Sequence, residues 1–587
     1  MAPVADLPKW SVEEFFPSLD APEYKHAFDA FNAQLERLSK SVEALASSSG
    51  DRSVELENVV TELNSALSDA RLLRSYVHAF VSTDSRDETA LARQSELAKP
   101  MTELSKLTTQ FTQIVGEMDL DPVLAKPGVL SDHEYPLRRA KFLATKLLSP
   151  QEETLLSELY DTGTGAWSRL HSNFTSQMSV EVENETVSMG TVRTMAYDPD
   201  RDVRKRGFEA ETAAWKANAL PLAQTLNSIK GQTSLVAKKR GWDSLLDESL
   251  YSASVDRESL EAMLATAKDS FPVFRRYLKA KAKALGCPGG LPWYDLFAPV
   301  GESADWSYDR GQAFILDKFA AYSSRLRDLA KRSFDDNWID AGPRSGKENG
   351  AFCMGLKKEQ SRILMNFKPS FSSVSTLAHE IGHAYHNFCM ADCTELQKST
   401  PMTLAETASI FCETIIKKAA IQECDESTKL AILEASLQGT CQVVVDISSR
   451  FLFESEIVDR RQDRELSVNE ICDAMERAQT ATYGDGLDRA TLHTYMWAAK
   501  PHYYSQRAFY NFPYMFGLLF SLGLYAEYEA NPEGFQDRYD KLLSETGKAS
   551  AFELAQRFGI DIRSKAFWAA SLSVIEKDVE EFERLVG

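Results

Sequence analysis

The segment TLAHEIGHAYHNF, residues 376–388, most constrains what this chain can fold into, because its residues fit one helix with two different faces. At about 100° per residue, one face of this helix gathers large apolar side chains, namely Val374, Leu377, Ile381, Tyr385 and Phe388. His379, His383 and His386 lie on the opposite face. A helix that packs on one side and presents histidines on the other is suited to the floor of a cleft.

His379 and His383 form the pattern H-E-x-x-H with Glu380 between them. Two imidazoles four residues apart lie on one face of a helix and can hold a single Zn²⁺, with the glutamate beside the open position of the metal as a proton acceptor. This spacing is typical of a zinc peptidase. His386 also lies near the site, and the pattern leaves open whether it serves as a ligand or as a packing residue behind the ligands.

A catalytic zinc needs a third protein ligand, and the segment STPMTLAETASIFCETIIKKAA after the histidines offers acidic candidates. Glu406 lies 23 residues beyond His383, which is enough chain to end one helix and bring a second alongside. However, Thr403 to Glu406 also matches a capping box, in which the carboxylate would bind backbone amide groups. From the residues alone both roles of Glu406 stay open. Glu413 either orients a ligand histidine or forms an ordinary salt bridge.

Composition limits the partners of the chain. With 86 acidic and 66 basic residues among 587, the formal net charge is −20, which argues against binding to nucleic acid or to an anionic membrane. The longest apolar-rich stretch, Met515 to Ala526, is too short to span a bilayer, and the first residues lack a basic start and an apolar signal core. We therefore expect a cytoplasmic protein. Its 8 cysteines lack C-x-x-C spacing, which favours reduced thiols.

The pattern along the chain predicts a mostly α fold in two lobes. Amphipathic helical periodicity runs to about residue 180, where residues 178–192 (MSVEVENETVSMGTV) alternate as a β-hairpin does. Helical periodicity then returns, and residues 362–367 predict a short strand just before the histidine helix. We expect an N-terminal helical lobe over residues 1–190, a catalytic domain over residues 191–587 and a small sheet near the zinc site.

A family resemblance rests on several of these segments together. HEIGHAYH followed by PMTLAETASIFCE resembles the metal core of the thimet oligopeptidase and oligoendopeptidase F group of zinc peptidases, and is closer to the oligoendopeptidase F branch. The resemblance extends to segments along most of the chain: WSVEEFFPSLDAPEY, YDPDRDVRKRGFEA, SRILMNFKPSFSSVSTLAHE and PHYYSQRAFYNFPYMFG. It implies that Glu406 is the third zinc ligand, and that a two-lobed, predominantly helical body encloses a deep channel for short peptides.

The same resemblance gives a role to the aromatic segment PHYYSQRAFYNFPYMFG. It implies that a histidine followed by tyrosines binds substrate and stabilises the oxyanion that forms when water attacks a peptide carbonyl, which makes His502, Tyr510 and Tyr514 the candidates. Packing in the core is the alternative role for each tyrosine. Which of the two tyrosines faces the carbonyl is left open.

The sequence therefore predicts an endopeptidase that cleaves short peptides and holds one Zn²⁺ through His379, His383 and Glu406, with Glu380 as the general base. The predicted catalytic residues are Glu380, His502, Tyr510 and Tyr514. Two alternatives remain. One is a zinc exopeptidase, either an aminopeptidase or a dipeptidyl carboxypeptidase, and the other is a helical peptide-binding protein without catalysis.

Overall fold

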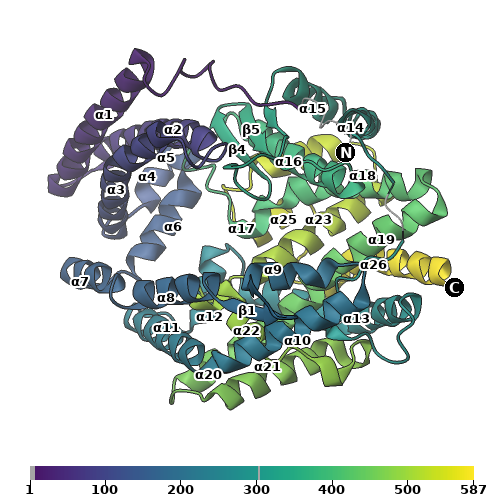
Figure 1. Ribbon diagram of the computed structural model, residues 1–587. Helices are drawn as coiled ribbons and strands as arrows, with labels where there is room; N and C mark the ends of the chain where they lie inside the picture. Colours follow the sequence, from purple (N-terminus) through teal and green to yellow (C-terminus); the bar gives the residue numbers. More distant parts are fainter. Residues whose placement is uncertain (1–6, 302–303) are drawn as a thin grey trace.

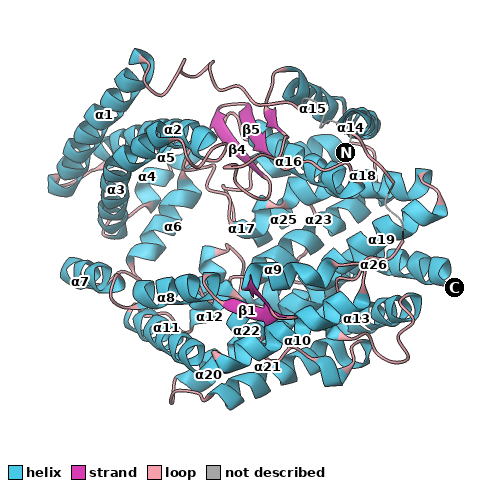
Figure 2. Cartoon of the chain, in the orientation of Figure 1, coloured by secondary structure: helices cyan, strands magenta, loops and turns pink. Residues whose placement is uncertain are grey.

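The computed structural model describes residues 7–301 and 304–587, and helices make up most of it (Figure 1). Two small sheets are the only other regular structure in those ranges, and Figure 2 shows them as magenta arrows among cyan helices. The prediction of a mostly α fold with a minor sheet is confirmed. Amphipathic periodicity produces this outcome because a helix with an apolar stripe is stabilised when that stripe packs against neighbouring helices.

The element bounds follow the chain. The helices before residue 300 are α1 (Pro22–Ser47), α2 (Ser53–Val81), α3 (Glu88–Gly116), α4 (Asp121–Leu124), α5 (Val129–Asp132), α6 (Glu134–Ala144), α7 (Pro150–Tyr160), α8 (Thr164–Ser176), α9 (Met189–Thr194), η1 (Met195–Tyr197), α10 (Arg201–Ala217), α11 (Ala219–Lys239), α12 (Leu245–Ser252), α13 (Arg257–Ala284) and η2 (Trp293–Asp295). The later helices are α14 (Tyr308–Tyr322), α15 (Ser324–Asp335), α16 (Phe371–Cys389), α17 (Met402–Ala405), α18 (Thr407–Glu423), α19 (Glu426–Cys441), the π-helix η3 (Gln442–Asp446), α20 (Ile447–Arg461), α21 (Val468–Tyr483), η4 (Gly484–Gly486), η5 (Arg489–Thr491), α22 (Met496–Ala499), η6 (Pro501–Tyr504), α23 (Phe512–Ala530), α24 (Phe535–Ser544), α25 (Ala551–Arg557) and α26 (Lys565–Val586).

The predicted hairpin is present as β1 (Ser179–Val182) and β2 (Glu185–Ser188), paired antiparallel. Its two turn residues, Glu183 and Asn184, have φ angles of 51° and 69°. Positive φ at both central residues is the geometry of the two-residue turns that match the twist of a hairpin. The prediction from the alternating pattern of residues 178–192 is confirmed.

The second sheet leads into the histidine helix and has the strand order β3-β5-β4. In this sheet β3 (Ile339–Asp340) lies parallel to β5 (Gln360–Leu364), and β4 (Phe352–Lys357) lies antiparallel to β5 on its other side. The predicted strand over residues 362–367 is thus confirmed with a shift of bounds. Pairing continues past the end of β5, because the backbone N–H of Met365 donates to the carbonyl of Asp340 at 2.9 Å.

Buried apolar side chains form two clusters. The smaller cluster comes from residues between Val12 and Leu137 together with Leu356 of β4, and the larger one comes from residues between Met178 and Phe582. The first helices are attached to the second sheet by a hydrogen bond of 3.1 Å from Ser75 Oγ to the carbonyl of Gly355. The predicted boundary at residue 190 stays a prediction.

One continuous helical stretch, Glu426–Arg461, is long and apolar enough to cross a membrane by length and composition. It joins α19, the π-helix η3 and α20, and 56% of its most apolar window is buried inside the protein. Burial of this extent is what a core helix of a large helical protein shows, so the stretch is weak evidence for a membrane span.

Candidate metal centre

Helix α16 carries both histidines of the H-E-x-x-H pattern. Its N-cap is Ser370, whose side chain accepts a hydrogen bond from the backbone N–H of Ser373. The predicted apolar face is buried, with Val374, Leu377 and Ile381 fully inaccessible. The imidazoles of His379 and His383 keep 24% of their side-chain surface accessible. The helix therefore packs on one side and leaves its histidine side within reach of a ligand.

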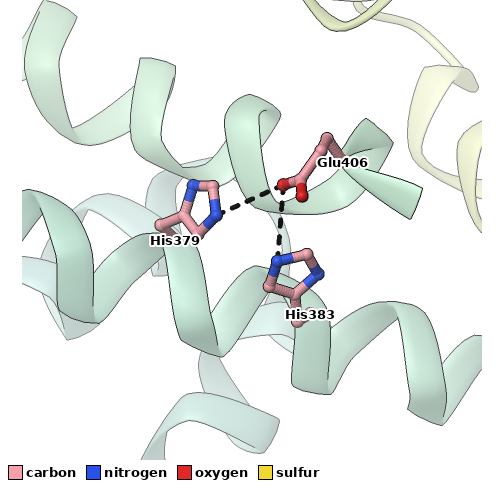
Figure 3. A group of neighbouring side chains, drawn as sticks. All are labelled: His379, His383 and Glu406. Carbon is pink, nitrogen blue, oxygen red and sulfur yellow. Dashed lines mark ion pairs between the residues drawn. The ribbon is translucent and has the colours of Figure 1, made fainter. Parts of the chain in front are cut away.

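Glu406 lies opposite the two histidines, at a break between α17 and α18 (Figure 3). Its Oε2 atom is 3.3 Å from Nε2 of His379 and 3.4 Å from Nε2 of His383. Ser409 Oγ donates a hydrogen bond of 2.7 Å to the same oxygen and fixes the carboxylate in this position. The structure thus brings together the three side chains that the sequence analysis assigned to the metal.

The capping role that the residues left open for Glu406 is not what the structure shows. Glu406 is the N-cap residue of α18, yet its side chain makes no capping hydrogen bond. Thr403 Oγ1 donates instead to the carbonyl of Ala253 at 2.6 Å, so neither half of a capping box forms. The helical stretch is interrupted at Glu406, between α17 and α18, and the carboxylate of this residue turns toward α16.

The close crossing of α16 and α18 depends on Gly382, a residue whose importance the sequence analysis missed. A Cβ atom at this position would lie 2.6 Å from the carbonyl oxygen of Ala408 and 2.6 Å from Cα of Ser409. Backbone atoms cannot move aside as a flexible side chain can. Only glycine therefore lets the helix with the histidines come close enough to the helix that follows Glu406.

Gly382→Ala is expected to force α16 and α18 apart and to lower the free energy of unfolding by about 1–3 kcal/mol, the usual cost of overpacking. Zinc affinity should fall with it, because the carboxylate moves away from the imidazoles. Thermal melts and zinc titrations test both effects. The matched control is Gly439→Ala in α19, where no heavy atom lies within 4 Å of the added Cβ. Equal melting temperatures for the two variants would contradict the close-crossing explanation.

Glu413 contacts the far side of the His379 ring. Its Oε2 lies 3.3 Å from Nδ1 of His379, and its Oε1 lies 2.6 Å from Nζ of Lys417. Burial alone would lower the pKa of His379, but the contacts with Glu406 and Glu413 outweigh it and raise this pKa to about 10. Burial alone would raise the pKa of Glu406, whereas its hydrogen bonds with the two imidazoles hold it well below the usual range. The two carboxylates therefore make the space around the His379 ring favourable for a positive charge.

Glu413→Gln is expected to lower zinc affinity about 10- to 100-fold, because an acceptor on Nδ1 fixes the ring and raises its basicity as a ligand. Competition with a chelator of known affinity measures the change. Lys417→Met is the informative companion, since it removes the charged partner of Glu413 and leaves the contacts with His379 and with Ser375 Oγ. If zinc binds the Glu413→Gln variant as tightly as the wild type, the side chain does not orient the ligand.

Glu380 is buried beside the histidines, with 5% of its surface accessible. Its Oε2 atom has no hydrogen-bond partner among the described residues. Burial raises the pKa of this carboxyl, and the Glu380 carboxylate in turn adds to the effect of burial in raising the pKa of Cys353 on β4. A buried carboxylate oxygen without a hydrogen-bond partner is uncommon in folded proteins and is compatible with a proton acceptor.

His386 does not join the other two histidines. It is buried, and its Nε2 lies 2.9 Å from Thr546 Oγ1. Burial lowers the pKa of His386 to about 4, so its ring is neutral at physiological pH. The question that the sequence left open is thus answered by the fold: His386 packs behind the ligand face.

The predicted aromatic group lies together in one place. The rings of His502 and Tyr510 stack with their centroids 5.0 Å apart, and the Tyr514 hydroxyl donates a hydrogen bond of 3.3 Å to the Tyr510 hydroxyl. Helix α23 carries Tyr514 and approaches Glu406 closely at Gly517, where an added Cβ would lie 3.1 Å from Cβ of Glu406. Tyr514 is one turn before Gly517, so it lies on the helix side that faces the metal centre.

The geometry of the three candidate ligands fits a zinc ion. Their ligand atoms all lie within 4.8 Å of one another. Two donor atoms that each bind the same tetrahedral zinc at about 2.1 Å are about 3.4 Å apart. The separations of 3.3 and 3.4 Å between Glu406 Oε2 and the two imidazole nitrogens match this value, and two imidazoles with one carboxylate are one of the donor sets of catalytic zinc.

A model of peptidase family M3 matches residues 194–574, which is more than half of the chain and includes every residue discussed for the site. The chain belongs to peptidase family M3. The prediction of an enzyme that cleaves peptide bonds is confirmed, and so is the resemblance from which part of the prediction was made.

Two relatives of this M3 peptidase align over most of its length. The group B oligopeptidase PepB of Streptococcus agalactiae is 24% identical over 547 residues, which cover 90% of each chain. The oligopeptidase PepF of Bacillus subtilis is 22% identical over 595 residues, covering 98% of this chain and 87% of the relative. The solved structure of oligoendopeptidase-F from Enterococcus faecium has a TM-score of 0.69 at 17% identity and covers 95% of the M3 peptidase and 99% of its own chain. The fold is therefore shared along the whole chain.

Proposed function

We propose that this M3 peptidase is a zinc-dependent endopeptidase that hydrolyses short oligopeptides in the cytoplasm. The observation that carries the proposal is the convergence of Nε2 of His379, Nε2 of His383 and Oε2 of Glu406, with the unpartnered carboxylate of Glu380 beside them. The names of the relatives, which are oligopeptidases and oligoendopeptidases F, support the choice of oligopeptides as substrates and of internal bonds as the point of cleavage.

In this proposal His379, His383 and Glu406 hold one Zn²⁺, while Glu413 orients His379. When bound, zinc polarises the substrate carbonyl and lowers the pKa of water to roughly 7, so that water becomes a nucleophile at neutral pH. Glu380 accepts the proton of the attacking water and delivers it to the departing amine. Burial raises the pKa of Glu380, which makes its carboxylate a stronger proton acceptor than an exposed carboxylate.

His502, Tyr510 and Tyr514 are proposed to bind the substrate and stabilise the oxyanion of the attacked carbonyl. Tyr514 is the stronger candidate for the direct contact, since it lies on the side of α23 that approaches Glu406. Burial and the contact with Tyr510 raise the pKa of the Tyr514 hydroxyl, and the Glu406 carboxylate adds to this effect. A raised pKa keeps the hydroxyl protonated and able to donate. Burial lowers the pKa of His502, which keeps this ring neutral.

Tyr514→Phe is expected to lower kcat about a hundredfold with little change in KM, because an oxyanion donor acts mainly in the transition state. Steady-state kinetics on one quenched peptide measures both constants. Tyr504→Phe is the matched control, since Tyr504 is a buried tyrosine of the same segment whose ring stacks on His171 with centroids 3.7 Å apart. If Tyr514→Phe and Tyr504→Phe have the same kcat, the Tyr514 hydroxyl does not stabilise the oxyanion, and its ring only packs.

The endopeptidase proposal is tested against the exopeptidase alternatives with quenched peptides that are acetylated at the N-terminus and amidated at the C-terminus. An endopeptidase cleaves them, and cleavage stops in the presence of a chelator and resumes when zinc is added. An aminopeptidase or a dipeptidyl carboxypeptidase needs a free end and leaves them intact. A peptide-binding protein without catalysis shows a chelator-dependent melting temperature and no hydrolysis of any peptide.

The expected partners follow from the same features. Short peptides are the proposed substrates, and the net charge of −20 disfavours nucleic acid and anionic membranes. A deep channel between the lobes, which would admit short peptides and exclude folded proteins, stays a proposal. Size selection can be measured by mass spectrometry on a peptide mixture of graded lengths.

A further inference from the structure

Two cavities meet at Glu248 of α12, beside the aromatic group of the proposed site. The first has a volume of about 260 Å³, and its walls include Tyr510 and the first residues of α23, the helix that carries Tyr514. The second has a volume of about 410 Å³ and lies between α7, α8, α11 and α12. Glu248 and Gln506 line both cavities, so the two adjoin at these side chains.

The smaller cavity shares walls with the proposed catalytic site. Tyr510 is one of these walls; its ring stacks on His502, and its hydroxyl accepts a hydrogen bond from the Tyr514 hydroxyl. A second wall is Met402 of α17, the short helix that ends directly before Glu406. An extended peptide advances about 3.3 Å per residue, so a substrate that contacts Tyr510 brings a residue near the cleaved bond to this cavity.

Hydrogen bonds between the walls hold the smaller cavity open. Ser249 Oγ of α12 donates to the carbonyl of Ala508 at 2.8 Å. The next residue, Phe509, has a φ of 52°, a left-handed conformation that a non-glycine residue adopts when its surroundings impose it. At the end of α12, the carbonyl of Ala253 accepts a hydrogen bond of 2.6 Å from Thr403 Oγ1 of α17. The cavity is therefore formed before a ligand binds, which lowers the entropic cost of binding.

Glu248 is a half-buried carboxylate without a partner of its own. Its side chain makes no hydrogen bond and no ion pair with the described residues. Burial raises the pKa of the Glu248 carboxyl, and the charge of Arg240 offsets only part of this effect. Arg240 is engaged elsewhere, because its guanidinium donates to the two oxygens of Glu153 at 3.2 and 2.7 Å. Arg507 also lines the smaller cavity, but it is exposed and does not shift the pKa of Glu248.

The other walls of the smaller cavity suit the stem of a long basic side chain. Met402, Phe512 and Pro513 supply apolar surface on which methylene groups can pack. An ammonium or guanidinium group at the end of such a stem would meet Glu248 in a charge-assisted hydrogen bond. A carboxylate would be repelled there, and a neutral side chain would leave Glu248 unpaired.

We propose that Glu248 is a specificity-determining residue, which binds a cationic group of the peptide substrate at one fixed position relative to the cleaved bond. The assignment rests on the proposed endopeptidase function. A lysine or arginine side chain and the free ammonium of the N-terminus share the chemistry that Glu248 recognises, and the test separates these two sources.

The test begins with cleavage maps, measured by mass spectrometry for the zinc-loaded wild type on a library of blocked peptides. kcat/KM is then measured for a matched pair of peptides with lysine or methionine at the preferred position, and for a pair with a free or an acetylated N-terminus. Glu248→Gln removes the charge and keeps the shape of the side chain. Glu261→Gln is the matched control, because Glu261 is an exposed residue of α13 that lines neither cavity. Affinities of the same peptides for a Glu380→Gln background, with and without Glu248→Gln, give a readout independent of turnover.

The wild type is expected to prefer the cationic member of one pair by about tenfold or more, the effect of a hydrogen bond to a charged group. The lysine pair shows this preference if a side chain binds Glu248, and the N-terminal pair shows it if the ammonium does. Glu248→Gln should remove most of the preference in kcat/KM and in affinity. The neutral peptide should be cleaved at the wild-type rate, which also shows that the variant is folded.

The assignment is overturned if the wild type cleaves with zinc dependence but without preference for a cation in either pair. It is also overturned if Glu248→Gln changes the preference no more than Glu261→Gln does. Absence of zinc-dependent cleavage of every peptide would instead overturn the proposed function itself, so the two failures are distinguishable.

Discussion

Glu380→Gln is expected to lower kcat by a factor of about 100 to 10,000, the range that general acid–base catalysis supplies. Glutamine has nearly the shape of glutamate and cannot accept the proton of the attacking water. Since Oε2 of Glu380 makes no hydrogen bond that stabilises the fold, the melting temperature and the zinc content should stay within error of the wild type.

The measurement combines steady-state kinetics with zinc analysis and a thermal melt on the same preparation. Glu423→Gln is the matched control, because Glu423 is an acidic residue on the neighbouring helix α18 that pairs with Lys318 at 2.5 Å on the surface. Turnover at the wild-type rate by a zinc-loaded Glu380→Gln preparation would show that another group takes the proton. A preparation that has lost its zinc would point to a ligand role instead.

Glu406→Ala is expected to abolish zinc binding at micromolar concentration, and peptidase activity with it. The reason is that two imidazoles on one helix remain, while the carboxylate that groups with both of them among the described residues is gone. We expect zinc affinity to fall more than a hundredfold, beyond the effect of removing a group that merely orients a ligand. Equilibrium dialysis followed by metal analysis measures the loss.

A second readout separates the metal role of Glu406 from a purely structural one. If the carboxylate stabilised only the start of α18, Glu406→Ala would lower the melting temperature of the metal-free protein and leave the zinc content unchanged. The metal role instead predicts that adding zinc raises the melting temperature of the wild type and not of the variant. Glu406→Asp is the graded companion, since a shortened carboxylate should retain part of the affinity.

Local patterns in the sequence predicted the parts of this protein that depend on neighbours in the chain. The period of apolar residues in 374–388 indicated the buried and the histidine faces of α16, and the alternation around Glu183 indicated the hairpin. The spacing of His379 and His383 indicated the zinc site for the same reason, because four residues make one helical turn. These features are fixed by dihedral angles and hydrogen bonds within a few residues.

The local sequence left the roles of other residues open, and contacts with residues distant in the chain distinguish between those roles. Glu406 fitted a capping box as well as a ligand role, until the approach of α16 and α18 at Gly382 placed its carboxylate against both imidazoles. His386 shared the histidine face of the helix, but Thr546, which is 160 residues away, holds its ring.

The sequence by itself therefore determined the helix, its two faces and the pair of histidines, because these follow from backbone periodicity. The tertiary structure decided which carboxylate meets them and which histidine stays out. The physical reason is that a metal centre needs donor atoms placed to within a few tenths of an ångström, and the packing of whole helices sets such distances. At Gly382 the absence of a single Cβ permits that packing.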